Sequence, residues 1–551
     1  MYSVKGTIHL PWEGEYGPDG PWQAVRISVG YFPNSTNFYA DVSTMWPDWS
    51  GTSKVLTPAS GGNYTATDSS SAVIVRQDEG YCPAQESTKS PIHGCWRGKT
   101  VVEDLRLERT TRGGTGTIGC DGTFEAVEEW VYGLPDGSNY SGRVGTLGLG
   151  KPNVPDPEDV PLAILQSLKS TTIIASMSFG LHMGSVALGQ PASLVLGGYE
   201  KSRALGSVGV FTFGGFGPPI LYLLDVLLGT QVGASPFARP GDEGSVWQGI
   251  KDNEGDIAED ITQQEGVKPG TALVVPDPTV PYIYLPPGTC EAAARRLPVT
   301  WNDRLGLYLW NTGDPAYQRI VRSPAYLSFV FADHIPANIT IKVPFRLLNL
   351  TLEPPLMPTP TPYFPCKPWN TEDGIWTLGR AFLQAAFVGA NFEQGIAFLA
   401  QAPGPDPVRR VTQALPPNDT TLQTNPIEEF ERSWLPSWTV LKEDTSTSSD
   451  TPSSSVPVEP SLGGNGGLST GAVVGIVLGV VAALVAAAVA VWFFWRRKGK
   501  QTEPLPSGDS PKEQPEMNGQ GEPAELGKPN PHELHCPAVF LELPVDNGPE
   551  R

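Results

Sequence analysis

Residues Gly471–Trp495 have the sequence GAVVGIVLGVVAALVAAAVAVWFFW, and this stretch decides how the rest of the chain is organised. It contains no charged residue and no proline. A helix of this length reaches about 37 Å, which is enough to cross the hydrocarbon core of a bilayer with some tilt. Buried helices of soluble proteins seldom run this long without a charge. The sequence therefore predicts one transmembrane helix over residues 471–495.

The residues that flank this span indicate its orientation. The aromatic cluster Trp492–Trp495 lies at one end, where such rings favour the membrane–water interface. Arg496, Arg497 and Lys498 follow directly, and no comparable basic cluster precedes the span. The positive-inside rule therefore places the C-terminus in the cytoplasm and the large N-terminal part outside the cell membrane.

Three glycines lie on one face of the predicted membrane helix. Gly471, Gly475 and Gly479 are spaced four residues apart. This spacing permits close packing of two helices, so we expect a homodimer that forms through the membrane span.

Composition excludes some classes of partner. The 551-residue chain carries a net charge of −20, whereas nucleic-acid-binding surfaces are basic. The 6 histidines show no metal-ligand spacing, and no phosphate-binding loop or Gly-x-Ser-x-Gly turn appears. We therefore expect no nucleic-acid partner, no metal and no cofactor.

Glycosylation sequons lie only on the predicted outer side of the membrane. This one-sidedness is typical of a glycosylated ectodomain. The asparagines of the sequons, all before the span, are Asn34, Asn63, Asn139, Asn338, Asn349 and Asn418.

Cysteine usage agrees with an oxidising compartment, where disulfides form. Five cysteines precede the span, so one of them is free, intermolecular, or left over from an incomplete gene model. They are Cys82, Cys95, Cys120, Cys290 and Cys366. The first 22 residues have neither a basic nor an apolar region of a signal peptide, so we expect an export signal from a segment missing here.

Short apolar alternations between glycine and proline turns predict a mostly β ectodomain. They recur at Val25–Val29, Ala72–Val75, Ile339–Val343 and Ala386–Ala390. Two stretches, 161–169 and 288–296, have helical spacing.

The composition changes after the ectodomain. Residues 441–470 are rich in Ser, Thr, Pro and Gly and predict a flexible stalk, and residues 496–551 predict a disordered cytoplasmic tail.

Four further stretches carry a family resemblance. They are Gly20-Pro-Trp-Gln-Ala-Val-Arg-Ile-Ser-Val-Gly30, Gly145-Thr-Leu-Gly-Leu-Gly150, Ser178-Phe-Gly-Leu181 with Leu194-Val-Leu-Gly-Gly-Tyr-Glu200, and Thr377-Leu-Gly-Arg-Ala-Phe-Leu-Gln384 with Ala390-Asn-Phe-Glu-Gln-Gly395. In this order and at these intervals they resemble the pepsin-like aspartic peptidases, in their fungal, membrane-anchored branch. The resemblance implies an all-β, bilobal fold with a substrate cleft, one lobe over residues 1–205 and the other over 206–440.

The resemblance also implies two aspartates, one per lobe, that share a proton because two adjacent carboxylates cannot both ionise easily. In the second lobe, Asp277 lies nine residues before Leu285-Pro286 closes the motif, as in the family, but Pro278 and Thr279 replace Thr-Gly.

In the first lobe the motif departs further from the family. If Trp49 is the family's tryptophan seven residues after the aspartate, Val42 takes the catalytic position. Asp41 serves only if the loop shifts by one residue, which turns a strand side chain to the opposite face.

The remaining family features are placed by the same resemblance. It implies a disulfide between Cys290 and Cys366, and leaves the pairing among Cys82, Cys95 and Cys120 open. Tyr64 and Tyr81 are the candidates for the tyrosine of the flap that covers the cleft.

These observations predict a fungal-type, single-pass cell-surface glycoprotein with a non-catalytic ectodomain. Its cleft would bind an extracellular peptide or a cell-wall glycan, as a sensor or adhesion module. The alternative is an active, membrane-anchored acid aspartic endopeptidase that uses Asp41 and Asp277. A third reading is a structural wall protein without a ligand.

Overall fold

Strands are the predominant secondary structure of the described chain, as the sequence predicts. The computed structural model describes residues 5–30, 43–49, 53–56, 64–81, 94–111, 114–150, 163–213, 217–239, 241–248, 270–332, 338–371, 374–405 and 409–442. The predicted stalk, membrane span with its three glycines, and cytoplasmic tail lie outside these residues. Among the described residues, no helix is long and apolar enough to cross a bilayer.

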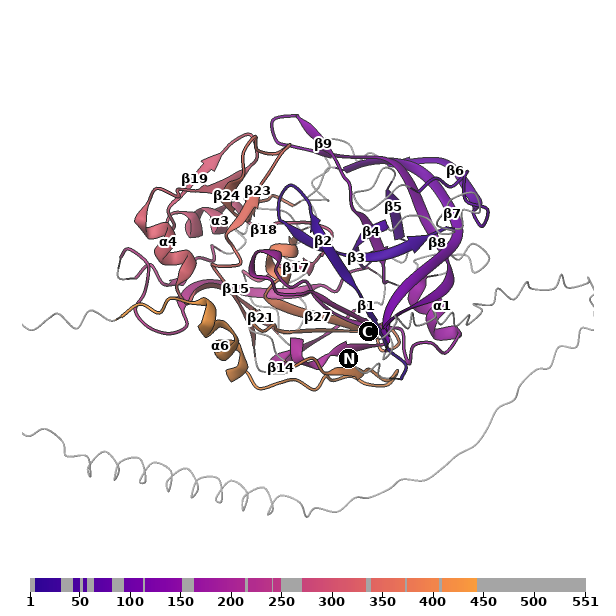
Figure 1. Ribbon diagram of the computed structural model, residues 1–551. Helices are drawn as coiled ribbons and strands as arrows, with labels where there is room; N and C mark the ends of the chain where they lie inside the picture. The colour runs from indigo at the N-terminus through magenta and orange to yellow at the C-terminus, as the bar shows by residue number, and fades with distance from the viewer. Residues whose placement is uncertain are drawn as a thin grey trace, which may run out of the picture. The chain divides into compact units, whose positions relative to one another are not determined.

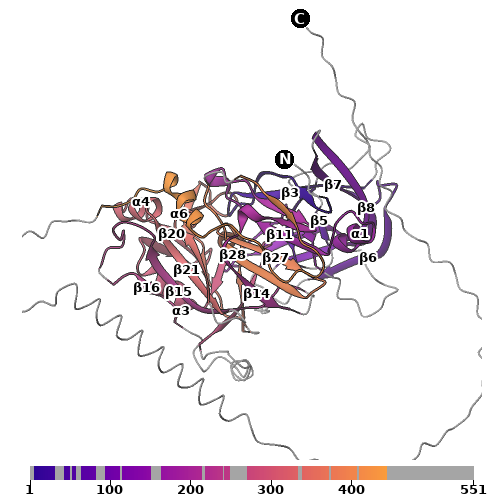
Figure 2. The same ribbon diagram turned by 90° about the horizontal axis from the view of Figure 1, so that it is seen from below.

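A six-stranded antiparallel sheet, here called the shared sheet, combines strands from both ends of the described chain. Figure 2 shows β11, β27 and β28 side by side. Most of its residues are buried, which explains their nearly continuous apolar and small side chains. In order, the strands are β1 (Ile8–Leu10), β12 (Ser193–Leu196), β11 (Ser178–His182), β27 (Ala386–Asn391), β28 (Ile396–Gln401) and β14 (Leu205–Thr212).

The N-terminal half (strands β2–β10) forms a nine-stranded sheet (Figure 1). An additional pairing of β3 with β7 joins strands that are distant in the sheet order. The strands are β2 (Trp12–Tyr16), β3 (Trp22–Val29), β4 (Ser43–Asp48), β10 (Gly145–Gly148), β5 (Ser53–Leu56), β8 (Gly114–Gly133), β7 (Gly94–Thr111), β6 (Val73–Tyr81) and, beside β8, β9 (Asn139–Ser141).

The C-terminal half (strands β15–β26) contains an eight-stranded and a four-stranded sheet. The first comprises β22 (Ile339–Pro344), β21 (Ala325–Ala332), β15 (Leu221–Thr230), β17 (Ala272–Pro276), β26 (Ile375–Leu378), β18 (Ile283–Leu285), β25 (Cys366–Pro368) and, beside β15, β16 (Gly244–Ser245). The second comprises β19 (Val299–Asn302), β20 (Leu307–Trp310), β24 (Thr361–Phe364) and β23 (Leu350–Leu352).

The described helices are short, and the two predicted from the sequence are confirmed as α1 and α3. They are α1 (Ile164–Ser170), α3 (Pro287–Ala294), α4 (Pro315–Arg322), α5 (Arg380–Leu383), α6 (Glu428–Trp434) and the 3₁₀ turns η2 (Val186–Leu188), η3 (Lys201–Arg203) and η4 (Leu435–Ser437). The disulfide between Cys290 and Cys366 is also present, and it fastens α3 to β25.

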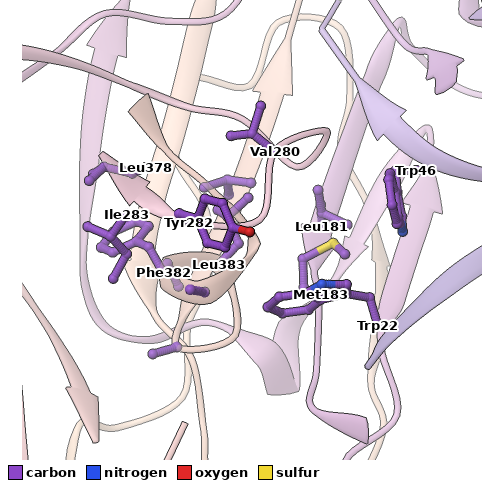
Figure 3. Close-up of a cluster of buried hydrophobic side chains, with 14 of the residues drawn as sticks. Trp22, Trp46, Leu181, Met183, Val280, Tyr282, Ile283, Leu378, Phe382 and Leu383 are labelled. Carbon is purple, nitrogen blue, oxygen red and sulfur yellow. The ribbon is translucent and has the colours of Figure 1, made fainter. Parts of the chain in front are cut away.

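One hydrophobic core runs through both halves and the shared sheet. The predicted boundary between residues 205 and 206 falls inside β14, a strand of that shared sheet. Figure 3 shows part of the core, with side chains from all three parts in one cluster: Trp22, Trp46, Leu181, Met183, Val280, Tyr282, Ile283, Leu378, Phe382 and Leu383.

A buried carboxylate fastens one edge of the shared sheet. Glu200, at the end of β13 (Gly198–Glu200, paired with β29, Thr412–Ala414), accepts hydrogen bonds from Ser193 at 2.8 Å and Ser202 at 2.8 Å. Arg203 Nε lies 3.3 Å and His9 Nε2 3.5 Å from its oxygens. Burial alone would raise the pKa of Glu200, but these partners hold it well below its usual range.

We expect Glu200→Gln to lower the free energy of unfolding at pH 7 by about 1–3 kcal/mol, because it leaves buried Arg203 without its charge partner. A depressed carboxyl pKa stabilises the fold above the unfolded-state pKa of about 4, and this stabilisation is lost as pH falls. Denaturant unfolding at pH 7 and pH 3 should therefore show that the free energies of unfolding of the wild type and Glu200→Gln differ less at pH 3 than at pH 7. Exposed Glu15→Gln is the control, and an equal loss in both variants would contradict the account.

Candidate functional site

Asp277 lies in a loop that starts at the end of β17. Strand β26 runs between β17, to which it is parallel, and β18, to which it is antiparallel. The Asp277 backbone N–H donates to Leu378 O at 3.0 Å. Gly379 follows, and a Cβ there would lie 2.4 Å from the carbonyl oxygens of Val280 and Tyr282. The loop therefore needs glycine at this point, because the backbones meet too closely for a side chain.

The N-terminal half repeats this arrangement around a different aspartate. Strand β10 runs between β4, to which it is parallel, and β5, to which it is antiparallel. Leu147 pairs with Pro47, just as Leu378 pairs with Pro276 in the other half. When the Leu-Gly pairs at 147–148 and 378–379 are aligned, Asp48 in the N-terminal half is therefore equivalent to Asp277 in the C-terminal half.

Asp48 was not among the residues singled out from the sequence. Asp41 and Val42, the residues considered for this position, lie outside the described residues. A signal for Asp48 was nevertheless present, because Pro-Asp occurs at 47–48 and at 276–277. Each copy is followed, after nearly the same length of chain, by Thr-Leu-Gly, at 146–148 and at 377–379.

Trp49, used above to set the register, has a structural role instead. Its indole is buried and donates from Nε1 to Pro276 O at 2.7 Å. The ring also packs on Phe179 of the shared sheet, with centroids 5.1 Å apart. Trp49 thus ties the residue after Asp48 to the residue before Asp277.

The charge of Asp48 acts on the carboxyl group of Asp277. Both side chains are partly buried. Burial of Asp277, and secondly the charge of Asp48, raise the pKa of Asp277 to about 6. Two hydrogen bonds from Thr279 to Oδ1, from the backbone N at 2.8 Å and from Oγ1 at 2.7 Å, and the charge of Arg380 act in the opposite direction. Near pH 5 Asp277 therefore holds a proton that an isolated aspartate would have lost.

A cavity of about 590 Å³ adjoins the loop of Asp277. Its size suits a small ligand or several side chains of a peptide. Thr279 lines it, and Tyr132 and Tyr140 form an aromatic wall with ring centroids 5.2 Å apart. The residues that line the cavity come from both halves, and they include Asp19, Trp46, Arg143, Pro281, Glu353 and Arg380.

The tyrosine candidates for a flap fall elsewhere or lack a described side chain. Tyr64 is 1% exposed, and its hydroxyl donates to Glu103 at 3.1 Å. It does not line the cavity beside Asp277. Tyr81 ends β6 and its side chain is not among those described.

Four of the six sequon asparagines are described. Asn139, Asn338 and Asn418 are exposed, and Asn139 also lines the cavity. Asn349 is half-buried and accepts a hydrogen bond from Tyr317 at 3.0 Å. Asn34 and Asn63 lie outside the described residues.

The strand register places Cys95 of β7 opposite Val131 of β8, and Cys120 of β8 opposite Leu105 of β7. The side chains of these two cysteines are not among those described, and Cys82 lies outside the described residues. The pairing among the three cysteines therefore stays open.

Compared with known proteins, the sequence matches no protein-family model and no curated protein. Function is therefore inferred from the geometry.

We expect Asp277→Asn to stabilise the fold near neutral pH. An acid whose pKa is raised on folding costs stability as pH rises from about 4 to about 6, because the folded chain binds that proton more tightly. The gain at pH 7 should reach at most about 3 kcal/mol and should vanish near pH 3.

Thermal unfolding of the full-length chain at both pH values measures this difference. Asp68→Asn, at an exposed turn, is the matched control and should show no pH-dependent gain. A destabilised Asp277→Asn variant at pH 7 would contradict the raised pKa.

Proposed function

We propose that this chain is an acid endopeptidase of the aspartic type, with Asp48 and Asp277 as its catalytic carboxyl pair. The proposal includes a two-lobed, pepsin-like fold, with the cavity beside Asp277 as part of the substrate cleft. It differs from the expectation of a non-catalytic ectodomain, whose premise was the absence of a first aspartate.

One observation supports this function above the others. Two loops of the same strand pattern, one from each half, carry an aspartate at the same register position. The charge of Asp48 is the second cause, after burial, of the raised pKa of Asp277, and this supports the proximity of the two groups. A lone carboxylate with a structural role would need neither the matched loop nor the second acid.

The chemistry follows from the shared proton. With one carboxyl ionised and the other protonated, the ionised one takes a proton from a water molecule that attacks the peptide carbonyl. The protonated carboxyl donates its proton to the carbonyl oxygen, which gives a gem-diol. When the C–N bond breaks, the first carboxyl passes the proton that it took from water to the leaving amine, and a hydroxyl of the gem-diol returns a proton to the second carboxylate as the new carboxyl group forms. Thr279 orients Asp277 through its two hydrogen bonds to Oδ1.

The proposed substrate is an unfolded or extended peptide. The cavity can receive its side chains against Tyr132, Tyr140 and Pro281. We retain the cell-surface, single-pass orientation from the sequence as part of this proposal. The sequons and the predicted membrane span support it, and the cleavage would then take place outside the cell or in an acidic secretory compartment.

Peptide binding without cleavage is the second candidate. It is favoured by Pro278, which has no N–H to offer to a bound water or to Asp277, and by the bulk of Thr279 where the family has glycine.

We expect the full-length chain to cleave an acid-unfolded protein at about pH 4–5, with activity falling as pH rises through about 6, where Asp277 loses its proton. Asp48→Asn and Asp277→Asn should each lower kcat/KM by roughly 100-fold or more. Asp68→Asn should leave activity unchanged.

The measurement is peptide release from the substrate protein between pH 3 and 8. Negligible peptide release by the wild type and by all variants would contradict the peptidase function and would favour the second candidate, peptide binding without cleavage. Loss of activity in Asp41→Asn but not in Asp48→Asn would assign the first carboxylate to Asp41 instead.

A further inference from the structure

The buried cation Arg380 contacts the loop that carries Asp277. Arg380 begins α5 directly after Gly379, and its side chain is 1% exposed. Its Nη1 donates to Pro278 O at 3.0 Å and to Thr279 O at 2.8 Å. These two carbonyls follow Asp277 in the chain, so Arg380 fixes the backbone of the loop just beyond the carboxyl group.

The same guanidinium also contacts the segment that leads to Asp48. Its central carbon lies 3.6 Å from the ring centroid of Trp46, which precedes Asp48 by two residues in β4. Such stacking of Arg on an aromatic ring is favourable and stronger when desolvated. One side chain thus contacts both of the segments that carry the proposed catalytic carboxyl groups.

A buried acid balances this cation. Arg380 Nη2 lies 3.6 Å from Asp19 Oδ1, and Asp19 is 3% exposed. Asp19 is itself held by Trp22, which donates from Nε1 to Oδ1 at 2.7 Å, and its carbonyl accepts from Tyr363 at 2.6 Å. An unpaired buried charge is very unfavourable, so Asp19 is the group that permits a cation at this place.

We propose that Arg380 and Asp19 are a positioning pair for the carboxyl groups of Asp48 and Asp277. Arg380 holds both segments in place, and Asp19 sets how much of the positive charge acts on Asp277. This inference rests on the proposed function for its catalytic meaning, but its electrostatic part can be measured without activity.

The sign of each neighbouring charge decides whether it raises or lowers the pKa of Asp277. The charge of Arg380 lowers the pKa of Asp277, although burial and Asp48 raise it overall. Neutralising Asp19 leaves the cation uncompensated and should lower the pKa of Asp277 further. Burial raises the pKa of Asp19, so the pair can lose its negative member in acid, where the proposed enzyme works.

The buried tyrosines and Lys367 around these two acids keep one charge state across the acid range, and the exposed carboxyl group of Glu353 lines the same cavity as Asp19. The tyrosines have raised pKa values, chiefly because they are buried, and so stay neutral. Burial lowers the pKa of Lys367 to about 8, so it stays charged below pH 7. The tyrosines are Tyr132, Tyr140, Tyr282, Tyr284 and Tyr363.

The experiment compares Asp19→Asn, which keeps the shape of the side chain, with Arg380→Met, which removes the charge. We expect the alkaline limb of the kcat/KM profile to move down by about one pH unit in Asp19→Asn and up by about one unit in Arg380→Met. Arg380→Lys should keep the limb near that of the wild type but lower kcat, because a lysine cannot make the same planar stack and forked hydrogen bonds. Asp68→Asn should shift nothing.

A second readout does not depend on cleavage. In the wild-type and Asp19→Asn backgrounds, the change in melting temperature caused by Asp277→Asn is followed from pH 3 to 8. The pH at which this change in melting temperature reaches half of its full size reports the titration of Asp277. This midpoint should lie at lower pH in the Asp19→Asn background than in the wild-type background. Arg380→Met can fail to fold, and Asp19→Asn still tests the proposal.

The outcomes separate the two proposals. A wild-type chain that cleaves nothing, but whose Asp277 titration moves with Asp19→Asn, overturns the peptidase function and keeps the electrostatic coupling. An unmoved midpoint and an unmoved alkaline limb in Asp19→Asn overturn the positioning pair, even if the chain is an active peptidase.

Discussion

Two carboxylates held close together repel each other, so one of them keeps its proton at a pH where an isolated aspartate would be ionised. Burial raises the pKa of Asp277, and the charge of Asp48 raises it further. The Trp49 indole, which donates to Pro276 O at 2.7 Å, joins the two loops that carry these aspartates. Two hydrogen bonds from Thr279 and the charge of Arg380 act on the pKa of Asp277 in the opposite direction.

The approach of the loops depends in turn on the shared sheet and the continuous core. Phe179 of β11 packs on Trp49, and β11 pairs with β27, which lies just after the Leu-Gly motif of the C-terminal half. Because the core is packed without a break between the halves, a shift of one loop would disturb side chains in the other. Precise placement of two acids from distant parts of the chain is therefore a property of the whole folded part that the structure describes.

Local patterns in the sequence predicted the strands and the two short helices, and the family resemblance singled out Asp277. They did not identify Asp48, because the expectation relied on the spacing to Trp49, and this tryptophan follows the aspartate directly. Its indole instead makes the contact with Pro276 O. Arg380 and Asp19 were also not foreseen, since their pairing joins residues that are far apart in sequence. Only the strand register, which is long-range information, shows that the two Pro-Asp pairs are equivalent.

Titration of the side-chain carboxyl carbons of Asp48 and Asp277 by NMR would test the central claim most directly. The wild-type chain and the Asp48→Asn variant would be compared, with aspartate carbon-13 labelling. The account predicts that Asp277 titrates near pH 6 in the wild type and closer to its ordinary value of 3.8 when the charge of Asp48 is removed. An Asp277 titration that is unchanged in the variant would show that the two carboxyl groups are not coupled.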